Sequence, residues 1–417
     1  MTTKPTKLLN KNFLLLWQGQ FVSLIGSQAH NIAMLFWIKH TTGSASLMGT
    51  ILMLAMIPSV ILGPIGGALA DRFSRRKIIV ITDLLNGLVI LSLAVLMFSK
   101  PDSTTLVITW LFIVAVVNGI LSSLFRPAIS AFIPDLVPKD KITGANSAIT
   151  SSAQFAQLIG QGLGGVAFRL LGAPVLFLID GLSFLFSGIS ELFISEPEVK
   201  TTEKDLKSSP LKTFLNEIKE GFHYVWRQKG LRELIVMAAF MNFFGAPFVT
   251  LLPFYVENVL NSTTDWYGIL LATEGIGVLI GAIVTGALKI SGKTRCNLML
   301  ILLLCVTLCE FFLGFARTIP LALCVMFLLG FSSGMVNVYI GSIIQMATPQ
   351  EIRGRVFGLL GAVASGLMPI GMGLSGIIAD MTGKNIPLIY AVSGGATAVL
   401  AIYLGTRTNF RRFLAGN

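Results

Sequence analysis

Four acidic residues lie inside long apolar runs of the chain, where a carboxylate is costly. They are Asp83, Asp180, Glu274 and Glu310. A charged side chain at the centre of a bilayer costs roughly 2.5 to 3.5 kcal/mol, so an unpaired carboxylate there tends to take up a proton. A carboxyl group that alternately faces two aqueous compartments could carry that proton across. Proton transfer is therefore the chemistry that these residues could perform.

The four acids differ in their positions along the apolar runs. Asp180 and Glu274 lie about eight or nine residues from the outer edge, near the middle of the bilayer at 1.5 Å per residue, and are the first candidates for proton coupling. Asp83 is a further candidate, although it follows a basic segment so closely that it could pair with that segment instead. Glu310 precedes two phenylalanines and ranks below the others.

Neutral polar side chains form stripes on two other apolar runs, and two further runs each carry a single polar residue of this kind. Lipid penalises a polar helix face, so we expect these stripes to meet a cavity or another helix. Combined with abundant Phe and Met, they suit a pocket for a bulky amphipathic solute. Hydrogen bonding between helices, without any ligand, is the alternative. The candidate cavity residues are Gln20, Ser27, Asn31, Gln154, Gln157, Gln161, Asn242 and Asn337.

The elements that position these residues are membrane spans. Of the 417 residues, 54% are hydrophobic and only 12% are charged, against roughly 25% charged in soluble domains. Apolar runs that can each cross about 30 Å of hydrocarbon predict an all-α membrane protein with twelve transmembrane helices. The predicted spans are 12–38, 46–70, 77–98, 105–125, 145–170, 173–195, 232–256, 265–289, 296–316, 319–345, 355–380 and 386–406.

The basic residues predict the orientation of these spans. With the N-terminus in the cytoplasm, 26 of the 31 Lys and Arg residues fall on the inner side, as the positive-inside rule requires. We therefore expect a multi-pass protein of a bacterial plasma membrane with both termini in the cytoplasm. The net charge of +11 then reflects contact with anionic lipid, and the chain has no compact basic domain to bind nucleic acid.

A polar stretch, residues 196–231, separates the first six spans from the last six. The sequence thus predicts an N-terminal bundle over 1–195, a linker over 196–231 and a C-terminal bundle over 232–417. Apolar residues at helical spacing predict an amphipathic helix at the cytoplasmic interface, with docking of a partner protein as an alternative. These residues are Leu211, Phe214, Leu215, Ile218, Phe222, Val225 and Trp226.

The two halves of the chain contain an internal repeat. A shift of 211 residues aligns the glycine-rich segment 160–165 with segment 371–376, so the fifth span corresponds to the eleventh. Because six spans separate the copies, the repeat is parallel, with its axis along the membrane normal. This predicts two pseudo-symmetric six-helix bundles. The simplest role for Gly160, Gly164 and Gly165 is close packing of helices.

The loop after the second span resembles a motif of the major facilitator superfamily. The segment 67–77 follows the pattern G-x-L-a-D-R-x-G-R-R-K, with Ser74 in place of the second glycine. The resemblance implies the major facilitator fold and a gate in which this loop latches one bundle to the other on the cytoplasmic face. An ordinary basic loop with a capping Asp is the alternative. The gate residues would be Gly67, Asp71, Arg72, Arg75, Arg76 and Lys77.

Other segments resemble the drug:proton antiporter branch that includes bacterial macrolide efflux proteins. These are segments 42–45, 133–138, 178–184 and 353–357. The fifth-span motif of that branch, G-P-x-x-G-G, is matched at Gly160, Gly164 and Gly165, whereas Gln161 replaces its proline. The resemblance implies export of a hydrophobic or amphipathic compound such as a macrolide, in exchange for protons. Export of an endogenous metabolite such as a siderophore is the alternative, followed by nutrient import and a scaffold without transport.

Several other classes of protein are excluded. Ala287 occupies the position where a phosphate-binding loop before Gly292 and Lys293 would need its first glycine, so no ATP-driven pump is indicated. The four cysteines and three histidines are scattered, so we predict no metal, disulfide or other cofactor and no enzymatic activity. The expected partners are a small-molecule substrate, protons and the lipid bilayer, and we expect the protein to work as a monomer.

Overall fold

A computed structural model describes residues 7–195, 222–288, 290–349 and 353–416. These residues are almost entirely helical, with no β-strand among them. Eleven helical segments of this described part are long and apolar enough to cross a membrane. One of them, Lys139–Leu192, spans 54 residues and contains two of the predicted spans, so the segments account for the twelve that the sequence predicts.

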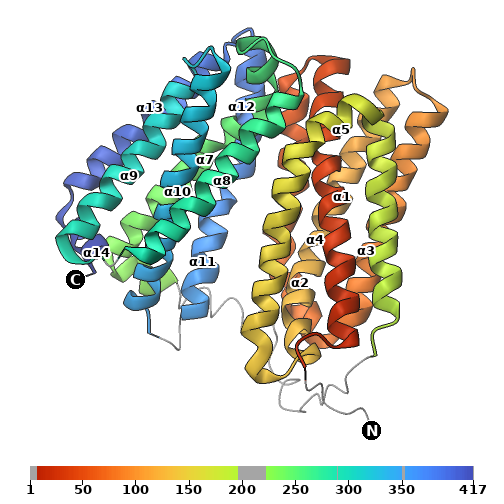
Figure 1. Cartoon of the computed structure of the whole chain (residues 1–417), viewed down its shortest axis with the longest axis horizontal. Helices are drawn as coiled ribbons and strands as arrows, with labels where there is room; N and C mark the ends of the chain where they lie inside the picture. Colours follow the sequence, from red (N-terminus) through yellow and green to blue (C-terminus); the bar gives the residue numbers. More distant parts are fainter. Residues whose placement is uncertain (1–6, 196–221, 289, 350–352, 417) are drawn as a thin grey trace. The chain divides into compact units, whose positions relative to one another are not determined.

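The helices of the first half are long and connected by short turns (Figure 1). They are α1 (Lys11–Thr42), α2 (Ala45–Arg72), α3 (Arg75–Ser99), α4 (Thr104–Leu136), the short η1 (Lys139–Lys141) and α5 (Ile142–Leu192). Between residues 170 and 173, where the sequence predicts a boundary between two spans, Gly172 has a φ of 74° and a ψ of 167°. A positive φ suits glycine because it has no Cβ. This residue therefore breaks α5 into two transmembrane halves.

The second half begins, within the described residues, with a helical turn over 222–227. It continues with α7 (Lys229–Phe254), the π-helical turn η3 (Tyr255–Val259), α8 (Asp265–Ala287), α9 (Gly292–Leu313), α10 (Ile319–Ala347), α11 (Arg353–Gly366), α12 (Met368–Met381), α13 (Ile386–Thr406) and α14 (Thr408–Ala415). The predicted span 355–380 is divided between α11 and α12. Pro369, which cannot donate a helical backbone hydrogen bond, lies in the first turn of α12.

The chain forms two compact units. Unit 1 contains residues 1–41 and 54–214, and unit 2 contains residues 42–53 and 215–417. The start of α2 belongs to unit 2 because Asp380, in the last turn of α12, binds it. The Asp380 carboxylate accepts hydrogen bonds from the backbone N–H groups of Ala45, at 3.1 Å, and Ser46, at 2.8 Å. These N–H groups have no partner within their own helix, and the N-terminal end of the helix dipole favours a negative charge.

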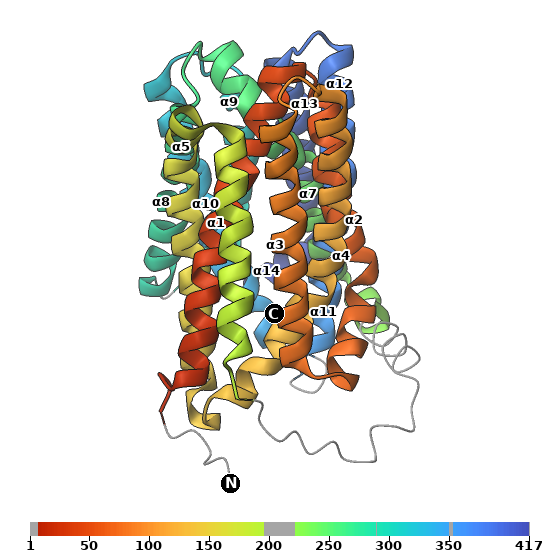
Figure 2. The same ribbon diagram turned by 90° about the vertical axis from the view of Figure 1, so that its right-hand side faces the viewer.

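Glycines determine how the helices of each unit approach one another. In unit 1, α1 packs against both halves of α5 (Figure 2). A Cβ at Gly164 would overlap Ile32 of α1, and a Cβ at Gly19 would lie 2.9 Å from the Ser187 hydroxyl. In unit 2, a Cβ at Gly371 of α12 would overlap the carbonyl oxygen of Phe243 in α7. Thus the fifth span packs on the first and the eleventh on the seventh, as a parallel repeat requires.

The predicted amphipathic linker helix lies mostly outside the described residues. Of its apolar face, the structure describes Phe222, Val225 and Trp226. Val225 is buried in the core of unit 2, whereas Phe222 and Trp226 are 46% and 53% exposed. This end of the predicted face is therefore helical and divided between the core and the surface.

Candidate functional site

A buried His–Asp pair lies in the middle of unit 1. His30 projects from α1 and Asp180 from the second half of α5, with 3.0 Å between Nδ1 of His30 and a carboxylate oxygen of Asp180. The side chains are 8% and 1% exposed. The Ser27 hydroxyl donates to the other carboxylate oxygen at 3.4 Å, and the His30 ring packs edge-on against Phe177. The pair combines two groups that can each bind a proton, away from bulk water.

The sequence analysis gave no role to His30, which the structure places against Asp180. Histidine is the side chain whose unperturbed charge changes nearest to neutral pH. The sequence did contain a signal, because Ser23, Ser27 and His30 follow one another at helical spacing on the stripe that begins at Gln20. What it did not show was that Asp180 lies opposite this stripe.

A second acidic cluster lies on the same side of α1, about three helical turns away. The Nε2 atom of Gln20 donates to Glu191 at 2.9 Å and to Asp83 at 3.3 Å. Asp83 is 1% exposed and Glu191 is fully buried. Gln20 also donates to the Ser187 hydroxyl at 3.3 Å. One amide group thus joins carboxyl groups of two different helices, α3 and α5.

The two clusters belong to one continuous seam between α1 and the second half of α5. On α5, Asp180, Ser183, Ser187 and Glu191 recur every three or four residues, which places them on one helix face. A Cβ at Gly26 of α1 would overlap the Ser183 hydroxyl and lie 2.9 Å from an Asp180 oxygen. The seam spans 11 residues, or about 16 Å at 1.5 Å per residue. Hydroxyl groups thus occupy the interval between the two acidic sites.

Two residues of this seam have partners that the sequence analysis did not predict. Asp83 accepts a hydrogen bond from Gln20, and Gln20, a candidate cavity residue, is only 6% exposed. Both observations have one cause, which is that the polar stripe on α1 faces acidic residues of unit 1. The sequence analysis assigned no role to Glu191, although its spacing from Asp180 places it on the same helix face.

The acids of unit 2 have fewer polar partners. Glu274 is half-buried on α8, where its backbone carbonyl contacts Gly330 of α10 so closely that a Cβ there would overlap it. Glu310 is 9% exposed, and a Cβ at Gly245 of α7 would lie 3.7 Å from its Oε1 atom. Glu310 therefore faces the interior of unit 2, whereas its rank as a candidate for proton coupling stays a prediction.

The motif loop before α3 is bound to its own unit by two arginines. Arg75 forms an ion pair with Asp135 at the end of α4, at 2.7 Å, and donates to the backbone oxygen of Ala131 at 3.0 Å. Arg76 donates to the backbone oxygen of Glu191 at 3.3 Å. Ser74 caps α3 through the backbone N–H of Lys77. The side chain of Asp71 lies outside the described residues, so the predicted latch stays a prediction.

Arg72 and Lys77 of this motif are exposed, and Gly67 has open space beside it.

The predicted cavity residues divide into two groups. Asn31, Gln154, Gln157 and Asn337 are exposed, as a cavity lining requires. Ser27 binds Asp180, Gln161 is half-buried, and Asn242 donates to the backbone oxygen of Ala238 in its own helix.

The buried seam, the apolar helices and the parallel repeat define a polytopic α-helical membrane protein built from two helical units. The chain belongs to the Major Facilitator Superfamily, whose family model matches residues 16–370. It is therefore a transporter rather than an enzyme. The resemblance seen in segment 67–77 is thus confirmed over most of the chain.

Similar proteins include one named for macrolide efflux and one named for transport of staphyloferrin A. Macrolide efflux protein A of Streptococcus pyogenes is 26% identical over 383 residues, covering 89% of this chain and 90% of the relative. The Staphyloferrin A transporter of Staphylococcus aureus is 24% identical over 404 residues, covering 93% and 94%. Among solved structures, that of the nucleoside transporter NupG aligns with a TM-score of 0.71 at 14% identity, covering 94% and 97%. This last likeness concerns the fold alone.

Proposed function

We propose that this transporter exports a hydrophobic or amphipathic small molecule, of the macrolide type, in exchange for protons. The observation that carries the proposal is the Asp180–His30 pair, which places a carboxylate and an imidazole 3.0 Å apart and almost fully buried in the membrane domain. A charged group in this environment has a high free-energy cost, so an ionisable residue inside a membrane span is a candidate for a functional role. A proton that neutralises Asp180 in one state and leaves it in another would couple the gradient to alternating access.

The exposed polar face of the first half of α5 supports an amphipathic substrate. Gln154 and Gln157 are exposed beside Phe155, which is itself 61% exposed. Amide groups among large apolar side chains can satisfy the polar groups of a bulky solute while its apolar surface is buried. The efflux protein of Streptococcus pyogenes described above supports the same class of substrate and the direction of transport. We further propose that both termini lie in the cytoplasm.

Transport by purified protein in liposomes tests this function. We expect efflux of a macrolide to accelerate when a pH gradient is imposed and to lose this acceleration in Asp180→Asn, with Glu274→Gln as a second variant. Asparagine and glutamine keep the shape of each side chain and remove its ability to exchange a proton. Full retention of gradient-driven transport by both variants would contradict proton coupling through these acids. Absence of transport for a panel of amphipathic compounds would contradict the substrate class.

Export of a siderophore is the second candidate, favoured by the likeness to the Staphyloferrin A transporter. A deletion strain distinguishes the two candidates. Hypersensitivity to macrolides with unchanged secretion supports drug export. Loss of extracellular siderophore under iron limitation, with unchanged drug sensitivity, supports the second candidate.

A further inference from the structure

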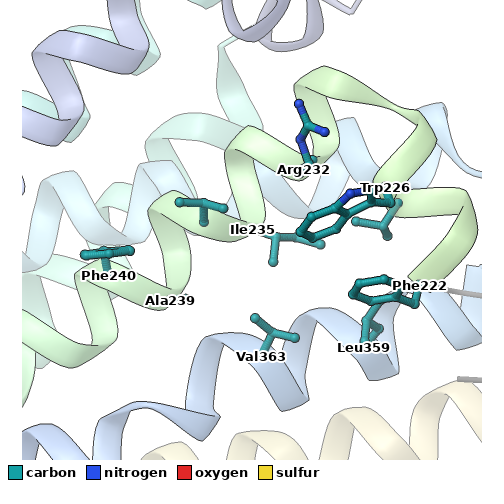
Figure 3. A pocket seen from close by; sticks show the side chains of 10 residues that line it. Phe222, Trp226, Arg232, Ile235, Ala239, Phe240, Leu359 and Val363 are labelled. Atoms are coloured by element: carbon teal, nitrogen blue, oxygen red, sulfur yellow. The ribbon is translucent and has the colours of Figure 1, made fainter. Parts of the chain in front are cut away.

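Unit 2 contains an apolar pocket beside the start of α7, distant in sequence from the buried acids. It is about 140 Å³ in volume and is lined from three sides by the turn 222–227, by α7 and by α11. Leu359 and Val363 of α11 face Ile235 and Ala239 of α7 across it (Figure 3). Arg232 is the single charged residue in the lining, and its guanidinium points away from the cavity in Figure 3.

The pocket changes in polarity along α7. Arg232 lies in the first turn of this helix, whereas Phe240, which closes the far end in Figure 3, lies eight residues further along. At 1.5 Å per residue this distance is about 12 Å. A charged residue therefore lies at the end of the membrane helix, and the residues of α7 that line the pocket beyond it are all apolar. A phospholipid has the same order of a charged head group and an apolar chain.

The entrance of the pocket carries aromatic rings and positive charge. Phe222 stacks on Trp226 with ring centroids 4.9 Å apart, and the Arg232 guanidinium lies 5.5 Å from the centre of the Trp226 ring. Tryptophan is enriched where membrane helices meet the head-group region. Arg227 and Lys229 are both exposed, so three cations occupy six residues. Among the described residues, no carboxylate forms an ion pair with Arg232.

We propose that this pocket binds an anionic phospholipid, with an acyl chain between α7 and α11 and the phosphate beside Arg232. Basic groups that flank a space between membrane helices are the chemistry that recognises anionic head groups. A transported solute would need several converging polar groups, and the side chains of the lining supply only those of Arg232 and the indole N–H of Trp226. The occupant also has access, because Phe222, Trp226 and Phe240 are between 44% and 53% exposed. The proposal does not depend on the substrate or on proton coupling.

Fluorescence quenching of Trp226 tests the proposal in the full chain. The other four tryptophans are replaced by phenylalanine, and the protein is placed in vesicles that contain a small fraction of brominated phosphatidylglycerol or brominated phosphatidylcholine. We expect half-maximal quenching at about a fivefold lower fraction of phosphatidylglycerol than of phosphatidylcholine. This ratio corresponds to about 1 kcal/mol for one basic residue at the membrane surface. A chain that retains only Trp110 should show no such preference.

Two variants locate the lipid. Arg232→Gln should remove the preference, whereas Arg407→Gln should keep it, because Arg407 also lies over an aromatic ring, at 4.8 Å from Tyr403, but outside the pocket. Ala239→Leu should fill the pocket and weaken quenching by both lipids. Equal quenching by the two lipids, or a preference that survives Arg232→Gln, would overturn the proposal. In parallel, native mass spectrometry of the chain with all five tryptophans should show retained phosphatidylglycerol that Ala239→Leu releases, and unchanged retention would also overturn it.

Discussion

Nδ1 of His30 lies 3.0 Å from a carboxylate oxygen of Asp180, and both side chains are more than nine-tenths buried. Because the two residues come from helices about 150 positions apart in sequence, only packing brings them together. A buried pair of this kind has two possible contributions, to folding and to transport. Truncation of one partner leaves the other buried without compensation, so isosteric variants separate the two contributions best.

The first prediction concerns this pair. We expect His30→Gln and Asp180→Asn each to lower gradient-driven efflux by about tenfold or more, the equivalent of about 1.4 kcal/mol. The double variant should be no slower than the slower single variant, because both changes remove the same interaction. Initial rates in liposomes measure this effect. His40→Gln is the matched control on the same helix, and losses that add in the double variant, or an equal loss for His40→Gln, would show that the pair does not act as a unit.

The second prediction concerns the amide that Asp83 and Glu191 share. Gln20→Leu removes the donor to two buried carboxyl groups and should destabilise the protein by about 1–3 kcal/mol. Adding Glu191→Gln should recover part of that loss, because only one acid then remains in the cluster. Thermal unfolding in detergent measures both variants, with the exposed Gln157→Leu as a control. A double variant less stable than Gln20→Leu would argue against electrostatic coupling of the two acids.

The sequence predicts the features of this arrangement that depend on neighbouring residues, but not the contacts between residues far apart in the chain. Span positions and the parallel repeat follow from local hydropathy and glycine spacing, and they agree with the helices of the structure. The partners of Asp83 and Asp180 do not follow, because hydropathy shows that a face is polar but not which helix it meets. The sequence does predict a boundary between two spans at Gly172, because this boundary depends on local hydropathy. Hydropathy does not predict the division between α11 and α12 at Leu367, because this residue lies within one uninterrupted apolar run.

The third prediction concerns the ion pair between Arg75 and Asp135, which are 24% and 23% exposed. Because solvent screens a pair of this exposure, Arg75→Gln and Asp135→Asn should each cost about 0.2–1 kcal/mol. The double variant should cost little more than either single change. A double-mutant cycle on thermal stability measures the coupling. A loss of several kcal/mol in Arg75→Gln, with a small loss in Asp135→Asn, would mean that Arg75 supports the loop mainly through its bond to Ala131.

The fourth prediction concerns the close approach of α8 and α10. A Cβ at Gly330 would overlap the carbonyl oxygen of Glu274, so the two helix backbones must separate to admit even a methyl group. Small residues at such a crossing hold lipid-embedded helices together. We expect Gly330→Ala to destabilise unit 2 by about 1–3 kcal/mol, the usual range for overpacking. Gly286→Ala, on α8 with nothing within 4 Å of the added Cβ, should leave stability unchanged or slightly raised, because alanine favours the helix.

Thiol labelling provides the measurement for this pair of variants. Cys324, which is exposed, and Cys305, which is half-buried, are first replaced by serine in every chain that is compared. The remaining Cys296 and Cys309 of α9 are buried, so a thiol-reactive fluorophore reaches them only when unit 2 opens. Gly330→Ala should therefore label at a lower temperature than the unmodified protein, and Gly286→Ala should not. If both variants label at the temperature of the unmodified protein, α8 and α10 can separate without loss of stability. The close packing of Glu274 against Gly330 would then contribute little to holding unit 2 together.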